Sequence, residues 1–134
     1  MGIDIWGPVK TPVLAPLGGT VHSFAFNNQY GDYGATIILQ HQLDGIAFHT
    51  LYGHLSLEDL RFGENQFINF GEQIGSFGAP EENGHWPPHL HFQLIIDMEW
   101  NKGDYPGVCS SADIPHYRHN CPDPNLVLQM QPSS

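Results

Sequence analysis

Two histidines stand two positions apart in the segment Pro88-His89-Leu90-His91-Phe92. The residues around them read as a β-strand, in which successive side chains point to opposite faces. His89 and His91 therefore emerge side by side, while their apolar neighbours point the other way. Two adjacent imidazoles on a rigid strand can bind a metal together, or one can bind it while the other handles protons. The competing interpretation is a chance pair on a solvated strand face, because histidine is an ordinary surface residue.

Two further residues have types suited to the same chemistry. His54, in the middle of residues 52–56, follows a strand and precedes a turn, where side chains commonly project into a cleft. Asp4 is an acid among apolar neighbours, so its carboxylate needs a partner, and a metal serves as well as a salt bridge or a cap. Taken alone, His54 is better interpreted as a surface residue at a strand end.

Short strands separated by glycine and proline are expected to position these side chains. The expected strands cover residues 11–15, 20–26, 35–42, 46–52 and 89–96, with a hairpin signal at Asp44-Gly45. Glycines at 71 and 75 bracket another strand entry, and residues 27–34 form a polar loop. Ser56 can cap a short helical turn over residues 57–60, with Asp59 in a capping-box position. The pattern predicts an all-β, mainly antiparallel domain.

Length and composition narrow the classes of protein. A chain of 134 residues with 40% apolar residues fits one compact domain with a real core. Fourteen acids against four bases give a formal charge of −10, which argues against nucleic acid or an anionic membrane as partner. Nine histidines beside only four Lys and Arg suit metal chemistry.

Neither a membrane span nor an export signal is expected. No apolar run approaches the roughly twenty residues of a membrane span, and Met1 leads straight into residues 2–6 without a basic and then a hydrophobic region. As written, the chain is expected to be cytoplasmic, and an upstream export signal would instead place it in the periplasm or outside the cell. Cys109 and Cys121 are expected to be free thiols, with a disulfide as the alternative, and their spacing is not a Cys-x-x-Cys motif.

The chain changes character after residue 97. Prolines at 106, 115, 122, 124 and 132 are scattered among polar residues without a strand or helix period. We therefore expect a β domain over residues 1–97 and an irregular Pro-rich extension or linker over residues 98–134.

Five segments, in the right order over roughly residues 1 to 97, resemble the lysostaphin/LytM-like zinc metalloendopeptidases. They are Gly2-Ile3-Asp4-Ile5, the segment Ala15 to Val21, Tyr52-Gly53-His54-Leu55-Ser56, Gly71-Glu72-Gln73-Ile74-Gly75 and Pro87-Pro88-His89-Leu90-His91-Phe92. The resemblance implies a small antiparallel β-sandwich with a groove, related to barrel-sandwich hybrids. It also implies one Zn²⁺ ion and a peptide substrate, in most members a cross-bridge of peptidoglycan. Carried over residue by residue, Asp4 and His91 correspond to metal ligands and His54 and His89 to catalytic imidazoles.

The first motif of that family is His-x-x-x-Asp, and its histidine would fall one position before Met1. Two remaining ligands would bind zinc much more weakly than three. Either the chain is truncated, or it is a degenerate member without hydrolytic activity. His22, His41, His49 and His85 are available as replacements, but none stands at the family position.

With the site complete, the resemblance implies a metal-bound water that attacks a peptide carbonyl. His54 or His89 would take the proton, and the other imidazole would stabilise the oxyanion or protonate the leaving amine.

The tail supports a third hypothesis. Residues 103–110, followed by residues 121–125, look like the stretch that joins such a domain to a class III aminotransferase in some multidomain bacterial proteins, which also carry a phosphotransferase-like module upstream. The hypotheses are thus a zinc endopeptidase, a metal-free binding module, and a linker domain that contacts its neighbours in a larger enzyme.

Overall fold

The computed structural model describes residues 2–27, 33–82, 86–99, 102–104, 116 and 120–124. These residues form eight strands and two short 3-10 helices, and the expected all-β class is confirmed. Their bounds are β1 (Ile3–Trp6), β2 (Pro12–Leu14), β3 (Gly19–Asn27), β4 (Gly34–Leu43), β5 (Ile46–Leu55), η1 (Leu57–Asp59), β6 (Phe67–Ile68), β7 (Gln73–Ser76), η2 (Pro80–Glu82) and β8 (His89–Ile95).

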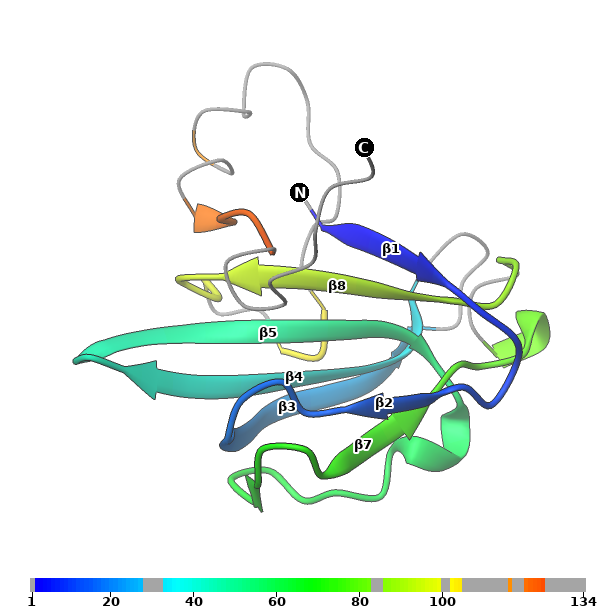
Figure 1. Cartoon of the computed structure of the whole chain (residues 1–134), viewed down its shortest axis with the longest axis horizontal. Coiled ribbons are helices and arrows are strands. Elements are labelled where there is room, and N and C mark those ends of the chain that lie inside the picture. The colour runs from blue at the N-terminus through cyan, green and yellow to red at the C-terminus, as the bar shows by residue number, and fades with distance from the viewer. Residues whose placement is uncertain are drawn as a thin grey trace.

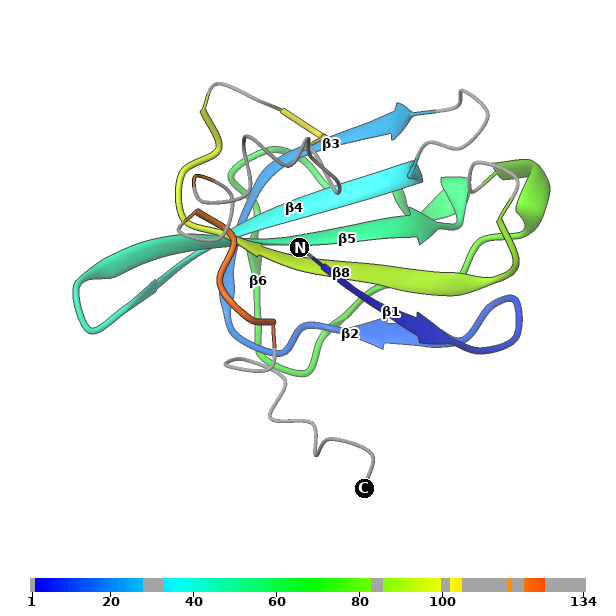
Figure 2. The ribbon, with the colours of Figure 1, turned by 90° about the horizontal axis from the view of Figure 1, so that it is seen from above.

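Six strands form one antiparallel sheet in the order β1-β8-β5-β4-β3-β6, and β2 pairs with β7 in a second, small sheet. Figure 2 shows β3, β4, β5 and β8 lying side by side with β1 beyond them. The hairpin at Asp44-Gly45 joins β4 to β5 as its sequence predicts, with positive φ at both residues. β1 and β6 were not expected from the sequence.

The large sheet is covered on both faces. One face carries the main core, to which β2, β3, β4, β5, β7 and β8 all contribute buried apolar side chains. The small sheet lies beneath this face in Figure 1. Val13 and Ile74 of the small sheet belong to the same buried cluster as Tyr52 and Phe92 of the large one.

The opposite face carries a smaller buried cluster made of Ile38, Leu51, Ile95, Met98 and Cys121. Residues 120–124, drawn in orange in Figure 1, lie over this face. Described residues beyond position 97 therefore pack on the sheet, although the expected boundary between residues 97 and 98 stays a prediction.

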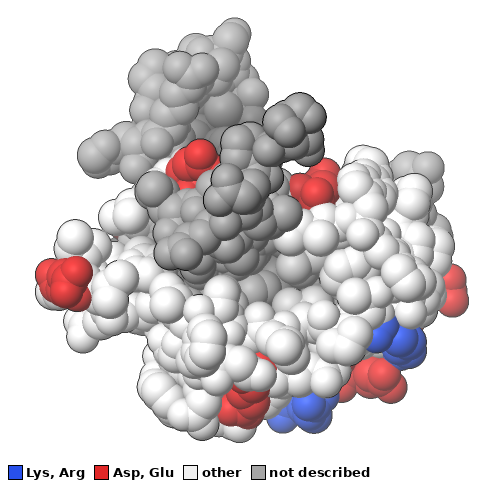
Figure 3. Space-filling view, in the orientation of Figure 1, with Lys and Arg blue, Asp and Glu red and all other residues white. Residues whose placement is uncertain are grey.

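Acidic side chains are scattered over the face seen in Figure 3, and the few cationic ones lie together near its lower edge. None of the helices within the described ranges is both long and apolar enough to cross a membrane. Cys109 lies outside the described residues, while Cys121 is buried.

Candidate active site

Asp4 and His91 face each other across two neighbouring strands. They are direct partners in the antiparallel pairing of β1 with β8, so both side chains leave the sheet on the same face. His91 Nδ1 lies 3.1 Å from Asp4 Oδ1. The Asp4 side chain is 45% exposed, so this carboxylate stands at the surface.

His89 lies beside this pair, two residues before His91 on β8. Its Nε2 is 3.7 Å from the same Asp4 oxygen, and its side chain is almost completely buried. Its other nitrogen, Nδ1, lies 2.7 Å from the carbonyl oxygen of Pro87. Because a carbonyl can only accept, Nδ1 must donate, and the neutral ring then presents Nε2 toward Asp4 as an acceptor.

His54 reaches the same place through an irregularity in β5. Ala35 pairs with Leu55 and Ile37 with Tyr52, so β5 carries one more residue than β4 in this stretch. Regular alternation would put His54 on the face of Tyr52, which belongs to the main core. The bulge turns His54 to the other face, where its ring centre lies 4.2 Å from that of His89.

The backbone of His54 has a φ of 65°, a left-handed conformation that is uncommon outside glycine. Hydrogen bonds on both sides hold it: the His54 N–H donates to the Tyr33 carbonyl, and the Gly78 N–H donates to the His54 carbonyl. Non-glycine residues in this conformation cluster at functional sites. Sequence analysis placed His54 at a strand end but did not predict the bulge.

Aromatic side chains enclose the three histidines. Trp6, 60% exposed, lies with its ring centre 4.3 Å from that of His89. Tyr33 stacks on His91 at 4.8 Å and meets His54 edge-on at 5.7 Å. Sequence analysis missed both residues. Trp6 could have been found, because it follows Asp4 by two positions in a strand and therefore shares its face.

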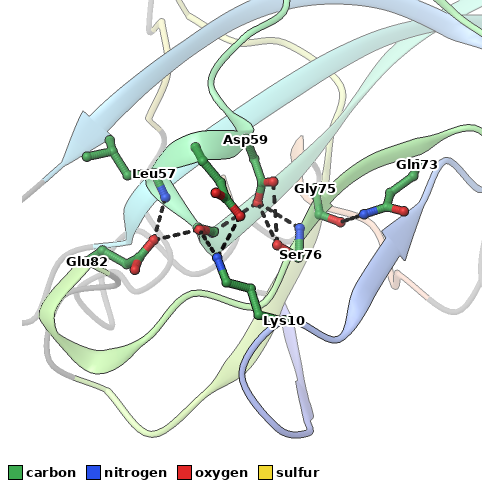
Figure 4. A network of polar contacts seen from close by, with 9 residues as sticks. Lys10, Leu57, Asp59, Gln73, Gly75, Ser76 and Glu82 are labelled. Atoms are coloured by element: carbon green, nitrogen blue, oxygen red, sulfur yellow. Dashed lines mark hydrogen bonds and ion pairs between the residues drawn. The ribbon is translucent and has the colours of Figure 1, made fainter.

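A network of polar contacts supports the turn that follows His54 (Figure 4). Asp59 is buried and accepts hydrogen bonds from the backbone N–H groups of Ser56 (3.1 Å) and Ser76 (2.7 Å). The expected capping contact between Ser56 and Asp59 is thus present. Burial raises the pKa of the Asp59 carboxyl, although the bonds from Ser76 and Ser56 oppose this. Lys10, in the turn between β1 and β2, donates to Ser56 Oγ at 3.0 Å.

The two candidate metal ligands, Asp4 and His91, lie at a distance from each other that suits zinc. Nitrogen and oxygen ligands lie about 2.0–2.1 Å from zinc, so two of them in a tetrahedron are about 3.3 Å apart. Asp4 Oδ1 and His91 Nδ1, at 3.1 Å, fit that spacing. Among the described residues, however, no three His, Cys, Asp or Glu side chains form a group that could hold an ion.

The histidines considered as replacement ligands hydrogen-bond elsewhere. His41 Nδ1 lies 2.8 Å from the Gly18 carbonyl oxygen, and His49 Nδ1 lies 3.1 Å from that of Ile95. His22 Nδ1 contacts Ser23 Oγ at 2.8 Å. His85 lies outside the described residues. Asp4 and His91 therefore fit two of the three protein ligands that a zinc site of this kind would need.

Comparison with known proteins matches residues 1–103 to the sequence profile of Peptidase family M23. An "Uncharacterized metalloprotease" of Haemophilus influenzae is 34% identical over 96 residues, which are 72% of this chain and 18% of that protein. "Endolysin 2638A" of Staphylococcus phage 2638A is 30% identical over 117 residues, which are 85% of this chain and 22% of that protein. The chain thus spans about a fifth of the length of the curated relatives that it matches.

Among solved structures, the catalytic domain of the antimicrobial peptidase lysostaphin from Staphylococcus simulans has the same fold. The match has a TM-score of 0.59 and 24% sequence identity, and it covers 87% of this chain and 77% of that domain.

Proposed function

This chain belongs to peptidase family M23, and we propose that it is a zinc metalloendopeptidase domain that hydrolyses peptide cross-bridges of peptidoglycan. One observation carries the proposal: Asp4, His54, His89 and His91 come from three different strands and gather on one face of the sheet. Two of these residues are adjacent in the β1–β8 pairing, whereas His54 joins them only through a bulge. A structural role alone gives no reason for this convergence of ionisable groups.

Asp4 and His91 would hold the zinc ion, together with a further ligand. When bound, zinc supplies a hydroxide near neutral pH and polarises the substrate carbonyl. His89 is positioned for proton transfer, because the Pro87 carbonyl occupies its Nδ1 and leaves Nε2 to take a proton from the attacking water. His54, whose ring lies against that of His89, would stabilise the oxyanion or protonate the leaving amine.

The reaction balances as a hydrolysis. The water oxygen bonds to the carbonyl carbon, the bond between carbon and nitrogen breaks, and the water proton passes through an imidazole to the departing amine. Trp6 packs beside His89 and limits the motion of its ring, which favours a fixed geometry for proton transfer. Tyr33 packs beside His91 and limits the motion of the proposed metal ligand.

The substrate class is proposed from the relatives. One is called an endolysin, and the solved domain belongs to an antimicrobial peptidase. The formal charge of −10 does not favour binding to an anionic polymer. Recognition of the peptide part of the cell wall therefore fits this chain better than recognition of anionic glycopolymers.

The experiment measures zinc content and peptidoglycan hydrolysis on two proteins: the 134-residue chain and a version with a histidine placed one position before Met1. The proposal expects the added histidine to raise zinc affinity and release new amino groups from purified cell walls. His91→Ala in the extended protein is the matched control, and it should lose both signals. Zinc bound without any cleavage of wall peptides would favour a non-catalytic binding module instead. If neither the added histidine nor His91→Ala changes the zinc content, the assigned metal site is ruled out.

A further inference from the structure

Gln93 connects the candidate site to the C-terminal segment. It lies two residues after His91 on β8 and is completely buried. Its Oε1 lies 2.9 Å from His91 Nε2, and its amide Nε2 donates to Cys121 Sγ at 3.4 Å. One buried amide therefore touches a candidate metal ligand on one side and the distant part of the chain on the other.

The contact with Gln93 decides which nitrogen of His91 carries its hydrogen. An amide oxygen can only accept, so His91 Nε2 must donate to it. A neutral imidazole has one N–H, and Nδ1 is then left with a lone pair. That lone pair faces Asp4 Oδ1, itself an acceptor, at 3.1 Å. Two acceptors at this distance repel each other unless a proton or a metal cation lies between them, and a metal site supplies the metal cation.

The reversed amide would have the opposite effect. With the amide nitrogen toward His91, Nε2 of the ring would accept and Nδ1 would carry the hydrogen. His91 would then donate to Asp4 and satisfy the carboxylate without a metal. The orientation of the Gln93 amide therefore separates a metal-binding pair from a metal-free hydrogen bond.

Cys121 belongs to a well-anchored part of the C-terminal segment. Its neighbour Asn120 is buried, donates to the Asp97 carbonyl at 2.7 Å and accepts from the Asp97 N–H at 2.6 Å. The Ile96 N–H donates to the Asn120 carbonyl at 2.7 Å. Residue 121 lies beyond the part of the chain, residues 1–103, that matches the peptidase family. Cys121, which contacts Gln93, therefore lies outside the segment that matches the family.

We propose that Gln93 is a positioning residue, which holds His91 in the tautomer that binds a divalent cation, and that the C-terminal segment holds Gln93 through Cys121. The inference rests on the proposed function in one respect, the assignment of His91 as a zinc ligand. It makes the C-terminal segment part of the support of the site. Partners of this kind contribute about 10–100-fold to metal affinity.

The test uses the full 134-residue chain and two readouts. The first is ¹⁵N NMR of the imidazoles in metal-free protein, above the ordinary histidine pKa of about 6.5, with the His91 signals identified by their loss in His91→Ala. The second is zinc affinity by titration calorimetry. Gln93→Leu removes the acceptor, whereas Gln93→Glu keeps an acceptor at the same position and serves as the conservative variant.

In the wild type, His91 should carry its hydrogen on Nε2. Gln93→Leu should move it toward Nδ1 and weaken zinc binding by about 10–100-fold, while Gln93→Glu should keep the wild-type tautomer and stay within a few-fold in affinity. Cys121→Ala should shift the tautomer in the direction of Gln93→Leu, by less. Ile38→Ala, a change in the same buried cluster as Cys121, controls for general loosening and should leave the tautomer unchanged.

A wild-type His91 with its hydrogen on Nδ1 would overturn the proposal, as would an unchanged tautomer in Gln93→Leu. The same tautomer shift in Ile38→Ala and Cys121→Ala would remove the role of Cys121. Failure of the proposed function gives a different result: zinc would bind the wild type and His91→Ala equally, whereas the NMR of metal-free protein would still report on Gln93.

Discussion

The large sheet carries two groups of histidines whose side chains have different surroundings. His54, His89 and His91 gather around Asp4 at one end of β8. His41 and His49 lie toward the other end, where His49 pairs with Ile95. Both groups are held by strands of the same sheet, so the fold alone does not explain the difference.

The two groups differ in what their ring nitrogens face. Both nitrogens of His41 are engaged by neutral protein groups, the Gly18 carbonyl at 2.8 Å and Thr50 Oγ1 at 2.7 Å. Burial lowers the pKa of His41 and of His49, so both favour the neutral form. At the other end, His89 and His91 each turn one nitrogen toward a carboxylate. A histidine cluster becomes a candidate site when an anion stands among its rings, as Asp4 does beside His89 and His91.

The largest expected effect separates the two roles within the first group. In the protein extended by a histidine before Met1, His89→Ala should leave zinc bound and reduce peptide hydrolysis by about 10²–10⁴-fold, the usual contribution of a general acid or base. His91→Ala should abolish zinc binding itself. Metal analysis beside a cleavage assay distinguishes the two, and equal loss of zinc in both variants would contradict the assignment.

A second prediction concerns the acid stability of the other group. The unfolded chain binds protons on His41 near the ordinary pKa of 6.5, but burial lowers the folded pKa, so the folded state binds fewer. Stability from this residue is therefore present above pH 6.5 and is lost as the pH falls from there toward the folded pKa. The slope is at most about 1.4 kcal/mol per pH unit for each histidine.

His41→Asn should reduce this acid sensitivity while lowering stability at neutral pH. Urea unfolding at a series of pH values provides the measurement, and the exposed change Gln42→Asn on the same strand is a control that should follow the wild type. An unchanged pH slope in His41→Asn would show that this ring does not titrate differently on folding.

The sequence predicted one part of the site well. The strand period over residues 89–96 correctly placed His89 and His91 on one face and Leu90 and Phe92 in the core. It could not give the position of Asp4, because β1 has only four residues and is defined by its pairing with β8, a contact between distant parts of the chain. The roles of these residues as zinc ligands and catalytic groups stay predictions.

Other features depended on geometry that no local pattern contains. The bulge that redirects His54 adds one residue to β5 without a glycine at the left-handed position. The spacing of Cys121 to Cys109 forms no motif and predicts no role in the site, yet Cys121 contacts Gln93 beside the site. The suggested origin in an aminotransferase fusion also remains a prediction.

A third prediction compares the aromatic rings that cover one histidine of each group. Trp6 stacks on His89 and is exposed, whereas Phe48 stacks on His41 at 5.2 Å and is half-buried. An aromatic contact is worth about 0.5–1.5 kcal/mol, or about 2–12-fold. Trp6→Ala should lower kcat/KM by about this factor in the extended protein and change the unfolding temperature little.

Phe48→Ala should do the reverse, lowering the unfolding temperature while kcat/KM holds. Steady-state kinetics with a soluble cross-bridge peptide, beside thermal unfolding of each variant, makes the comparison. A Trp6→Ala protein with unchanged kinetics would mean that the ring over His89 does not restrict it.

The smallest expected effect concerns the second carboxylate near the site. Asp59 is buried, and burial raises its pKa, whereas half-exposed Asp4 stands among imidazoles. A raised pKa means that the folded state binds the proton more readily than the unfolded state. Ionised Asp59 therefore opposes folding at neutral pH, and this cost falls as the pH drops through the folded pKa toward the ordinary value of 3.8.

Asp59→Asn removes that proton. The stability of the wild type relative to Asp59→Asn should therefore increase on acidification, opposite in sign to the effect of His41. This dependence of stability on pH should be weaker than that from His41, because the hydrogen bonds from Ser76 and Ser56 oppose the effect of burial on the Asp59 carboxyl. Urea unfolding of both proteins between neutral pH and about pH 4 measures the difference. If the wild type instead lost stability relative to Asp59→Asn in acid, the hydrogen bonds from Ser76 and Ser56 would outweigh burial. Asp59 would then be a carboxylate that the turn after His54 needs in its charged form.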